Sequence, residues 1–243
     1  MEATEADSGF QLRLLLAVTA AIAVAVAVFA ALCPLYATDT LCRYAPMAEA
    51  FAAGEWSEAF HPRFGVGMSV VSGLLSLLGV NGLSACAAVS SAAWALGAVP
   101  LWCIAARVFD RRTAWFAFAL YFLCPQIAVW GVKGLREPFK TLGVLVMVWS
   151  VFMCRDRGWR ALAAAAAGAA LMVLFKPDAI PLCGLLAIAF AAADRFGRRS
   201  WALFAVIAAA LQPMCLLTFL WTGYWLPAAQ YVPVFVRLTG GAG

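Results

Sequence analysis

The sequence predicts an all-α polytopic membrane protein with about seven transmembrane helices and a non-spanning helix in the first external loop. The first observation is composition: of 243 residues, 65% are hydrophobic and 12% are charged, and the mean hydropathy is +0.92. Soluble domains carry about 25% charged residues. The second observation is that the apolar runs are continuous and do not alternate with polar residues, as strands of a membrane β-barrel would.

The first predicted helix is the apolar run 14–33. It has the full length of a membrane span, whereas the apolar core of a cleaved signal has about 7–15 residues. The residues before it are acidic, with Glu2, Glu5 and Asp7, and Arg13 is the basic flank. We therefore expect a transmembrane helix here and not a removable signal.

The remaining spans follow from the distribution of arginine. Three turns are strongly basic, at 107–112, 155–160 and 195–199. The positive-inside rule places all three in the cytoplasm together with Arg13 only if the run 64–80, which is short and rich in Gly and Ser, does not cross. The other predicted spans are 83–105, 113–131, 138–153, 161–175, 179–193 and 201–221.

This topology predicts a multi-pass protein of the cell membrane with a cytoplasmic N-terminus and an external loop over residues 34–82. The alternative, eight spans with the N-terminus outside, is less consistent with the arginines. Basic residues on the outer face oppose the usual charge bias, so they are expected to bind anionic headgroups. These outer cations are Arg43, Arg63, Lys133, Arg136, Lys140 and Lys176.

The order of several short motifs resembles a known family. Asp39, Tyr44 and Ala48 follow the first helix, and Gly54 precedes a weak apolar helix that ends in Leu-Leu-Gly at 77–79. The next span ends in the basic run up to Arg112. This pattern resembles the N-terminal half of the GT-C glycosyltransferases, in particular the dolichyl-phosphate-mannose protein mannosyltransferase, lipid A aminoarabinose transferase and Rgt-like group.

The resemblance implies transfer of a sugar from a polyprenyl-phosphate-linked donor on the extracytoplasmic face. It implies catalytic roles for two acids, Asp39 in the first external loop and Glu137 in the motif Gly-Leu-Arg-Glu-Pro. Such a carboxylate would act as general base or orient the acceptor, and nearby cations would stabilise the departing phosphate. The candidate residues for binding substrate or lipid phosphate are Arg63, Lys133, Arg136, His61 and Tyr44.

No cofactor is expected, although a divalent metal site shared by Asp39 and Glu137 is left open as an alternative. The expected partners are a lipid-linked sugar donor and membrane lipids. Nucleic acid is not expected, because the basic residues lie in separate short turns. The chain, residues 1–243, is interpreted as a single GT-C-like domain that is shorter than typical members, so a membrane partner that supplies missing helices is a further expectation.

Several residues also have ordinary structural explanations. Asp39 could cap the helix that starts near Thr40, and Arg136 could pair with Glu137 at a helix start before Pro138. His61 and Arg63 could simply lie at the membrane interface. At the level of function, the alternatives to an enzyme are a transporter or flippase subunit and a non-catalytic scaffold or remnant. A transporter would place charges at mid-membrane depth, whereas here they lie at the ends of the runs.

Overall fold

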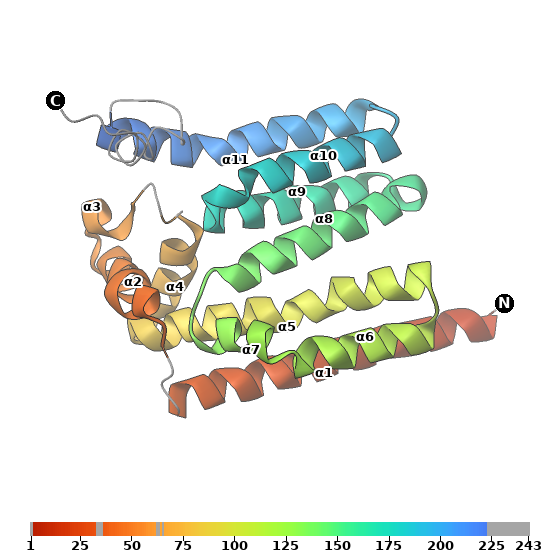
Figure 1. Ribbon diagram of the computed structural model, residues 1–243, viewed down its shortest axis with the longest axis horizontal. Coiled ribbons are helices and arrows are strands. Elements are labelled where there is room, and N and C mark those ends of the chain that lie inside the picture. The colour runs from red at the N-terminus through yellow and green to blue at the C-terminus, as the bar shows by residue number, and fades with distance from the viewer. Residues whose placement is uncertain (1, 33–35, 62–63, 65, 223–243) are drawn as a thin grey trace, which may run out of the picture.

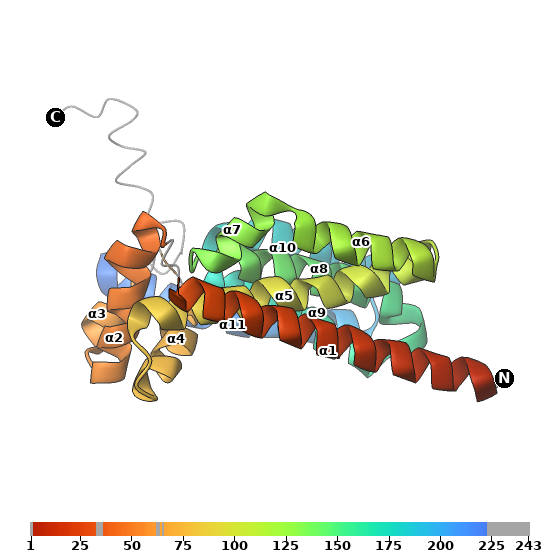
Figure 2. The same ribbon diagram turned by 90° about the horizontal axis from the view of Figure 1, so that it is seen from below.

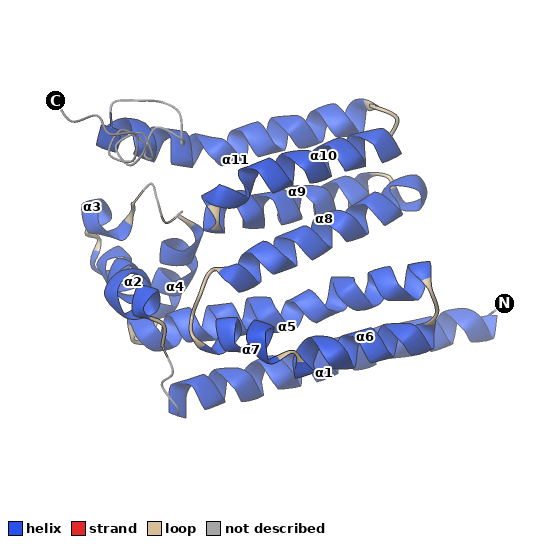
Figure 3. Ribbon diagram, in the orientation of Figure 1, coloured by secondary structure: helices blue, strands red, loops and turns tan. Residues whose placement is uncertain are grey.

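The computed structural model describes residues 2–32, 36–61, 64 and 66–222, and the side chains within these ranges apart from 2–10, 12, 31, 155–157 and 221–222. The described part is helical and contains no strand (Figure 3). Its helices are α1 Glu2–Leu32, η1 Thr40–Tyr44, α2 Ala45–Ala53, α3 Trp56–Ala59, α4 Gly67–Leu77, α5 Gly82–Val108, α6 Arg111–Leu123, α7 Pro125–Val132, α8 Glu137–Arg157, α9 Trp159–Phe175, η2 Pro177–Ala179, α10 Ile180–Ala193 and α11 Arg198–Thr222.

The long helices run roughly parallel or antiparallel and form an elongated bundle with two distinct ends (Figure 1). One end holds the start of α1 together with the turns α5–α6, α8–α9 and α10–α11. These turns are the three basic turns of the sequence, so we call this end the basic end. The opposite end, where α1 ends and the short helices α2, α3 and α4 lie, is called the loop end (Figure 2).

Four described helices are long and apolar enough to cross a membrane: α1, α5, α8 and α11. The pair α6 and α7 passes the same test as one bent unit, which gives up to five spans. Helices α4 and α9 and the segment Pro177–Ala193 are apolar but shorter, with 10–17 residues each. Length and composition therefore support four or five spans, and the count of seven stays a prediction.

The predicted span 113–131 is not one straight helix but the bent pair α6 and α7. The chain bends by 57° between α6 and α7. The cause is Pro125: proline lacks an amide hydrogen, and its ring disfavours helical geometry at the preceding residue. Accordingly, Cys124 has an extended backbone with φ −72° and ψ 106°. The bend turns α7 toward the start of α8, so it helps to place the loop before Glu137.

Helices α8 and α9 form a hairpin whose backbones touch. A Cβ atom added to Gly143 would lie 2.7 Å from the carbonyl oxygen of Gly168, and the reverse distance is also 2.7 Å. Only glycine allows two helices to approach this closely. Because the hairpin is antiparallel, it brings the start of α8 beside the end of α9 at the loop end.

The loop end is built from short helices that pack on α5. Helix α2 ends at Gly54, whose φ of +78° is the left-handed geometry that favours glycine at a helix end. The carboxylate of Glu49 on α2 accepts a hydrogen bond of 3.0 Å from the amide of Gly82, the first residue of α5. The packed core beneath includes Tyr44, Met68, Cys86, Phe139 and Phe175. These contacts fix the segment after α1 against the bundle.

Candidate active site

The turn that carries Asp39 contacts the loop that precedes α8. The hydroxyl of Thr40 shares its single hydrogen between the carbonyl of Lys133, at 2.7 Å, and that of Gly134, at 3.1 Å. Gly134 has φ +71°, and a Cβ atom there would lie 2.9 Å from Thr40 Cγ2. The glycine thus permits both the turn and the close approach. Segments almost a hundred residues apart in sequence meet at this point.

Asp39 remains half exposed, and its side chain makes no cap hydrogen bond. Its backbone is already helical, with φ −63° and ψ −34°, whereas a capping residue typically has extended geometry. The interpretation of Asp39 as a helix cap is therefore wrong. Its Oδ1 instead lies 3.2 Å from Nη1 of Arg43, one helical turn further on. The carboxylate is both paired and open to solvent.

Arg136 is fixed by carbonyls and aromatic rings. Its Nη1 donates to the carbonyl of Phe64 at 2.5 Å and to that of Phe175 at 3.3 Å. Its guanidinium carbon lies 5.2 Å from the ring centroid of Tyr44 and 5.7 Å from that of Phe64. These distances are in the range of cation–π contacts. Arg136 therefore links the segment before α4, the end of α9 and the junction between η1 and α2.

Tyr44 is 3% exposed and lies beneath Arg136. Burial raises the pKa of its hydroxyl; the charge of Arg136 opposes this shift, while the carboxylates of Asp39 and Glu137 add to it. The charges of both predicted catalytic acids therefore shift the pKa of this phenol in the same direction.

Glu137 begins α8 and pairs with the lysine that directly follows α9, at the same end of the hairpin. Its Oε1 lies 2.5 Å from Nζ of Lys176, and the two side chains are 28% and 15% exposed. The same lysine lies 3.8 Å from Oδ2 of Asp178. The expected pairing of Glu137 with Arg136 is replaced by this one, because Arg136 turns toward the carbonyls of Phe64 and Phe175.

The other predicted residues lie around the same end. The ring of His61 packs 4.9 Å from that of Phe64, and Arg43 lies 4.7 Å from the Phe64 centroid. Lys133 is partly buried, and its carbonyl accepts the bond from Thr40. Arg63 lies outside the described residues. Among the residues that are described, no group of three His, Cys, Asp or Glu side chains could hold a metal ion.

Sequence reasoning missed two central residues. Phe64 is contacted by Tyr44, His61, Arg43 and Arg136, yet in the sequence it is one apolar residue among many. Lys176 was expected only as an outer cation in a turn. Its position directly after an apolar run and before Pro177 marks a helix end, but its pairing with Glu137 depends on the packing of α8 on α9.

The family model of the dolichyl-phosphate-mannose-protein mannosyltransferases matches residues 61–225 of this chain. The chain belongs to this family. The matched region covers more than half of the sequence and includes Arg136, Glu137 and Lys176, whereas Asp39 and Tyr44 precede it. No curated protein and no solved structure matches the chain. Membership in the mannosyltransferase family indicates a multi-pass membrane glycosyltransferase of the GT-C type that uses a lipid-linked sugar donor.

Proposed function

We propose that this protein transfers a sugar from a polyprenyl-phosphate-linked donor to an acceptor on the extracytoplasmic face of the cell membrane. The single observation that supports it most is the gathering of charged groups at the loop end. Arg43 and Arg136 lie over the rings of Phe64 and Tyr44. Asp39 pairs with Arg43, and Glu137, the residue after Arg136, pairs with Lys176.

The proposed chemistry needs both kinds of charge. The acceptor group must lose a proton or be aligned as the bond between the sugar and the phosphate breaks, and a carboxylate can do this. Asp39 is the better candidate for the base, because its carboxylate is half exposed. Glu137 is held by Lys176, so its proposed role is to orient the acceptor. The phosphate that leaves gains negative charge, which guanidinium and ammonium groups stabilise.

The cations are proposed to act in different ways. Lys133, Arg136 and Arg63 would contact the lipid phosphate, with His61 beside them. Tyr44, which is buried under Arg136, would position that guanidinium and not touch the sugar. In this proposal, each predicted binding residue either contacts the phosphate or positions a side chain that does.

The proposed topology has seven spans and a single GT-C-like domain over residues 1–243. Helices α9 and Pro177–Ala193 would be short spans, and α4 with 11 residues would stay in the external loop 34–82. The gathering of the basic turns and the start of α1 at one end supports this arrangement (Figure 1). A membrane partner that supplies further helices is part of the same proposal.

The decisive experiment is the variant Asp39→Asn in proteoliposomes. Dolichyl-phosphate mannose serves as donor probe and membranes of the source cell supply acceptors, and release of dolichyl phosphate is measured. We expect Asp39→Asn to slow transfer by about 100- to 10,000-fold, the usual contribution of a positioned base. The matched control is Glu58→Gln, which removes an exposed carboxylate from the neighbouring helix α3.

Two results would contradict the assignment. If Asp39→Asn transferred the sugar at the rate of the unmodified protein, Asp39 would have no catalytic role. No transfer by the unmodified protein, with dolichyl-phosphate mannose and with other polyprenyl-phosphate sugars, would favour a non-catalytic scaffold. Elution of each variant as the same size-exclusion peak as the unmodified protein separates loss of chemistry from loss of fold.

A further inference from the structure

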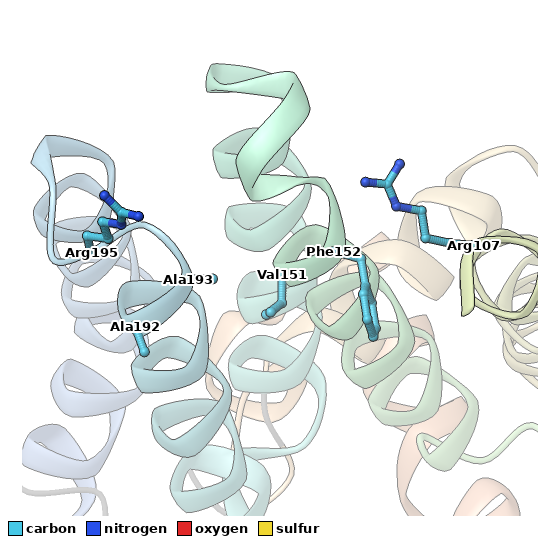
Figure 4. A pocket seen from close by; sticks show the side chains of 6 residues that line it. All are labelled: Arg107, Val151, Phe152, Ala192, Ala193 and Arg195. Atoms are coloured by element: carbon cyan, nitrogen blue, oxygen red, sulfur yellow. The ribbon is translucent and has the colours of Figure 1, made fainter. Parts of the chain in front are cut away.

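The basic end contains a cavity that the proposed reaction does not use. It has a volume of about 450 Å³ and lies between the ends of α5, α8 and α10 (Figure 4). Its lining residues are Arg107, Val151, Phe152, Ala192, Ala193 and Arg195. None of these is a candidate for sugar transfer, and the cavity lies at the opposite end of the bundle from Asp39 and Glu137 (Figure 1).

The lining divides into a charged rim and an apolar wall. In Figure 4, Arg107 and Arg195 lie on opposite sides of the cavity, and both guanidinium groups are at the same end of it. Between them, Val151 and Phe152 of α8 form one apolar wall, with Ala192 and Ala193 of α10 facing them. The alanines are small, so space remains between the two helices.

The position of Arg195 is set by an unusual turn. Arg195 and Phe196 are consecutive non-glycine residues with φ of +52° and +54°. Such left-handed geometry costs on the order of 1–3 kcal/mol per residue and persists only where the surroundings enforce it. Here the amides of Arg195 and Phe196 donate to the carbonyls of Ala192 and Ala191, at 3.1 and 2.8 Å.

Asp194 fixes the same turn to its neighbours. Its Oδ2 accepts hydrogen bonds from the hydroxyl of Ser200 at 2.9 Å and from the amide of Ser200 at 3.2 Å. Its Oδ1 pairs with Arg199, and Nη1 of Arg199 donates to the carbonyl of Cys154 on α8 at 3.1 Å. The two walls of the cavity, α8 and α10, are therefore held at a fixed separation.

We propose that this cavity binds an anionic phospholipid from the leaflet at the basic end, with the headgroup phosphate at Arg107 and Arg195 and an acyl chain against Phe152. Arginine binds phosphate with several donors at once, and basic pockets between membrane helices suit anionic headgroups. Phe152 is 39% exposed, so a chain can pack on it. A soluble anion would pair with the arginines but would make no favourable contact with the apolar wall.

The test measures lipid retention by the full chain in nanodiscs. Discs contain phosphatidylcholine alone or equal parts of phosphatidylcholine and phosphatidylglycerol, and native mass spectrometry counts the lipids that stay bound after release from the disc. We expect retained phosphatidylglycerol and no comparable retention of phosphatidylcholine. Each arginine near a membrane surface contributes about 1 kcal/mol, so Arg107→Gln or Arg195→Gln should each weaken retention about fivefold.

The matched control is the double variant Arg112→Gln/Arg198→Gln. It removes two exposed arginines from the same end of the bundle, outside the cavity lining. We expect it to retain phosphatidylglycerol like the unmodified protein, while Arg107→Gln/Arg195→Gln loses it. Equal loss in both double variants would show a general effect of surface charge and would overturn the proposal.

A second variant tests the apolar wall and separates a lipid from a free anion. Ala193→Trp keeps both arginines and fills the space between α8 and α10, so we expect it to lose retained lipid as well. Soluble glycerophosphate, which has the headgroup but no chain, should fail to displace the lipid. Unchanged retention by Ala193→Trp, or displacement by glycerophosphate at the concentration of the lipid, would show a headgroup-only anion site and contradict the proposal.

Discussion

At the scale of single residues, the loop end is defined by charges that are paired with partners from distant segments. Glu137 meets Lys176 across the open end of the α8–α9 hairpin, and Arg136 reaches the carbonyls of Phe64 and Phe175. Such contacts both position the side chains of the candidate site and stabilise the fold. A substitution here therefore changes stability as well as binding, and the two effects must be measured separately.

Lys176→Met should destabilise the protein through Glu137. The substitution leaves a carboxylate that is 28% exposed without its cation, and an unsatisfied group of this kind costs about 1–3 kcal/mol. Thermal unfolding in detergent, followed by tryptophan fluorescence, should show a lower midpoint. The double variant Lys176→Met/Glu137→Gln should recover part of the loss. If the losses of the two single variants simply add in the double variant, the pair is not coupled and the prediction is contradicted.

At the scale of helices, the sequence predicted which apolar segments are helical better than it predicted how those helices bend and pack. Composition and the apolar runs predicted the long helices, whereas η1, α2 and α3 lie in the segment that was predicted as external loop. The bend between α6 and α7 follows from Pro125, which lies within the predicted span 113–131. Residues 64–80 were expected to hold a short helix, and α4 covers Gly67–Leu77. The pairing of Glu137 with Lys176 could not be predicted, because it depends on which helices pack and at what depth.

The close backbone contact between α8 and α9 leads to a stability prediction. Gly143→Ala would place a methyl group 2.7 Å from the carbonyl oxygen of Gly168, so α8 and α9 must separate. Such overpacking costs about 1–3 kcal/mol, and the thermal midpoint should fall. Gly184→Ala on α10 is the matched control, since nothing lies within 4 Å of its added carbon. A midpoint for Gly143→Ala equal to that of Gly184→Ala would contradict the close packing.

At the scale of the whole molecule, the three arginine-rich turns lie together at one end of the bundle. The basic end carries the arginine turns, and the loop end carries acids and cations that are paired with one another. The sequence predicted this clustering of the arginine turns from the positive-inside rule alone. What it could not supply is the aromatic core around Phe64, because one phenylalanine in an apolar chain carries no local signal.

Labelling with a membrane-impermeant thiol reagent tests the proposed orientation. In a background with reduced thiol reactivity, Glu58→Cys and Asn81→Cys should react from outside the cell, because both lie at the loop end. Arg112→Cys and Arg198→Cys should react only after the membrane is opened, because they lie at the basic end. Labelling of Asn81→Cys only from the cytoplasm would refute both the seven-span topology and the external loop 34–82.

The surroundings of Arg136 and Lys176 give these two cations different kinds of partner. Arg136 is held by two uncharged carbonyls and two aromatic rings, which fix its position without cancelling its charge. Lys176 lies 2.5 Å from Glu137 and 3.8 Å from Asp178, so two carboxylates offset its charge. An incoming anion would therefore meet a stronger positive field at Arg136 than at Lys176.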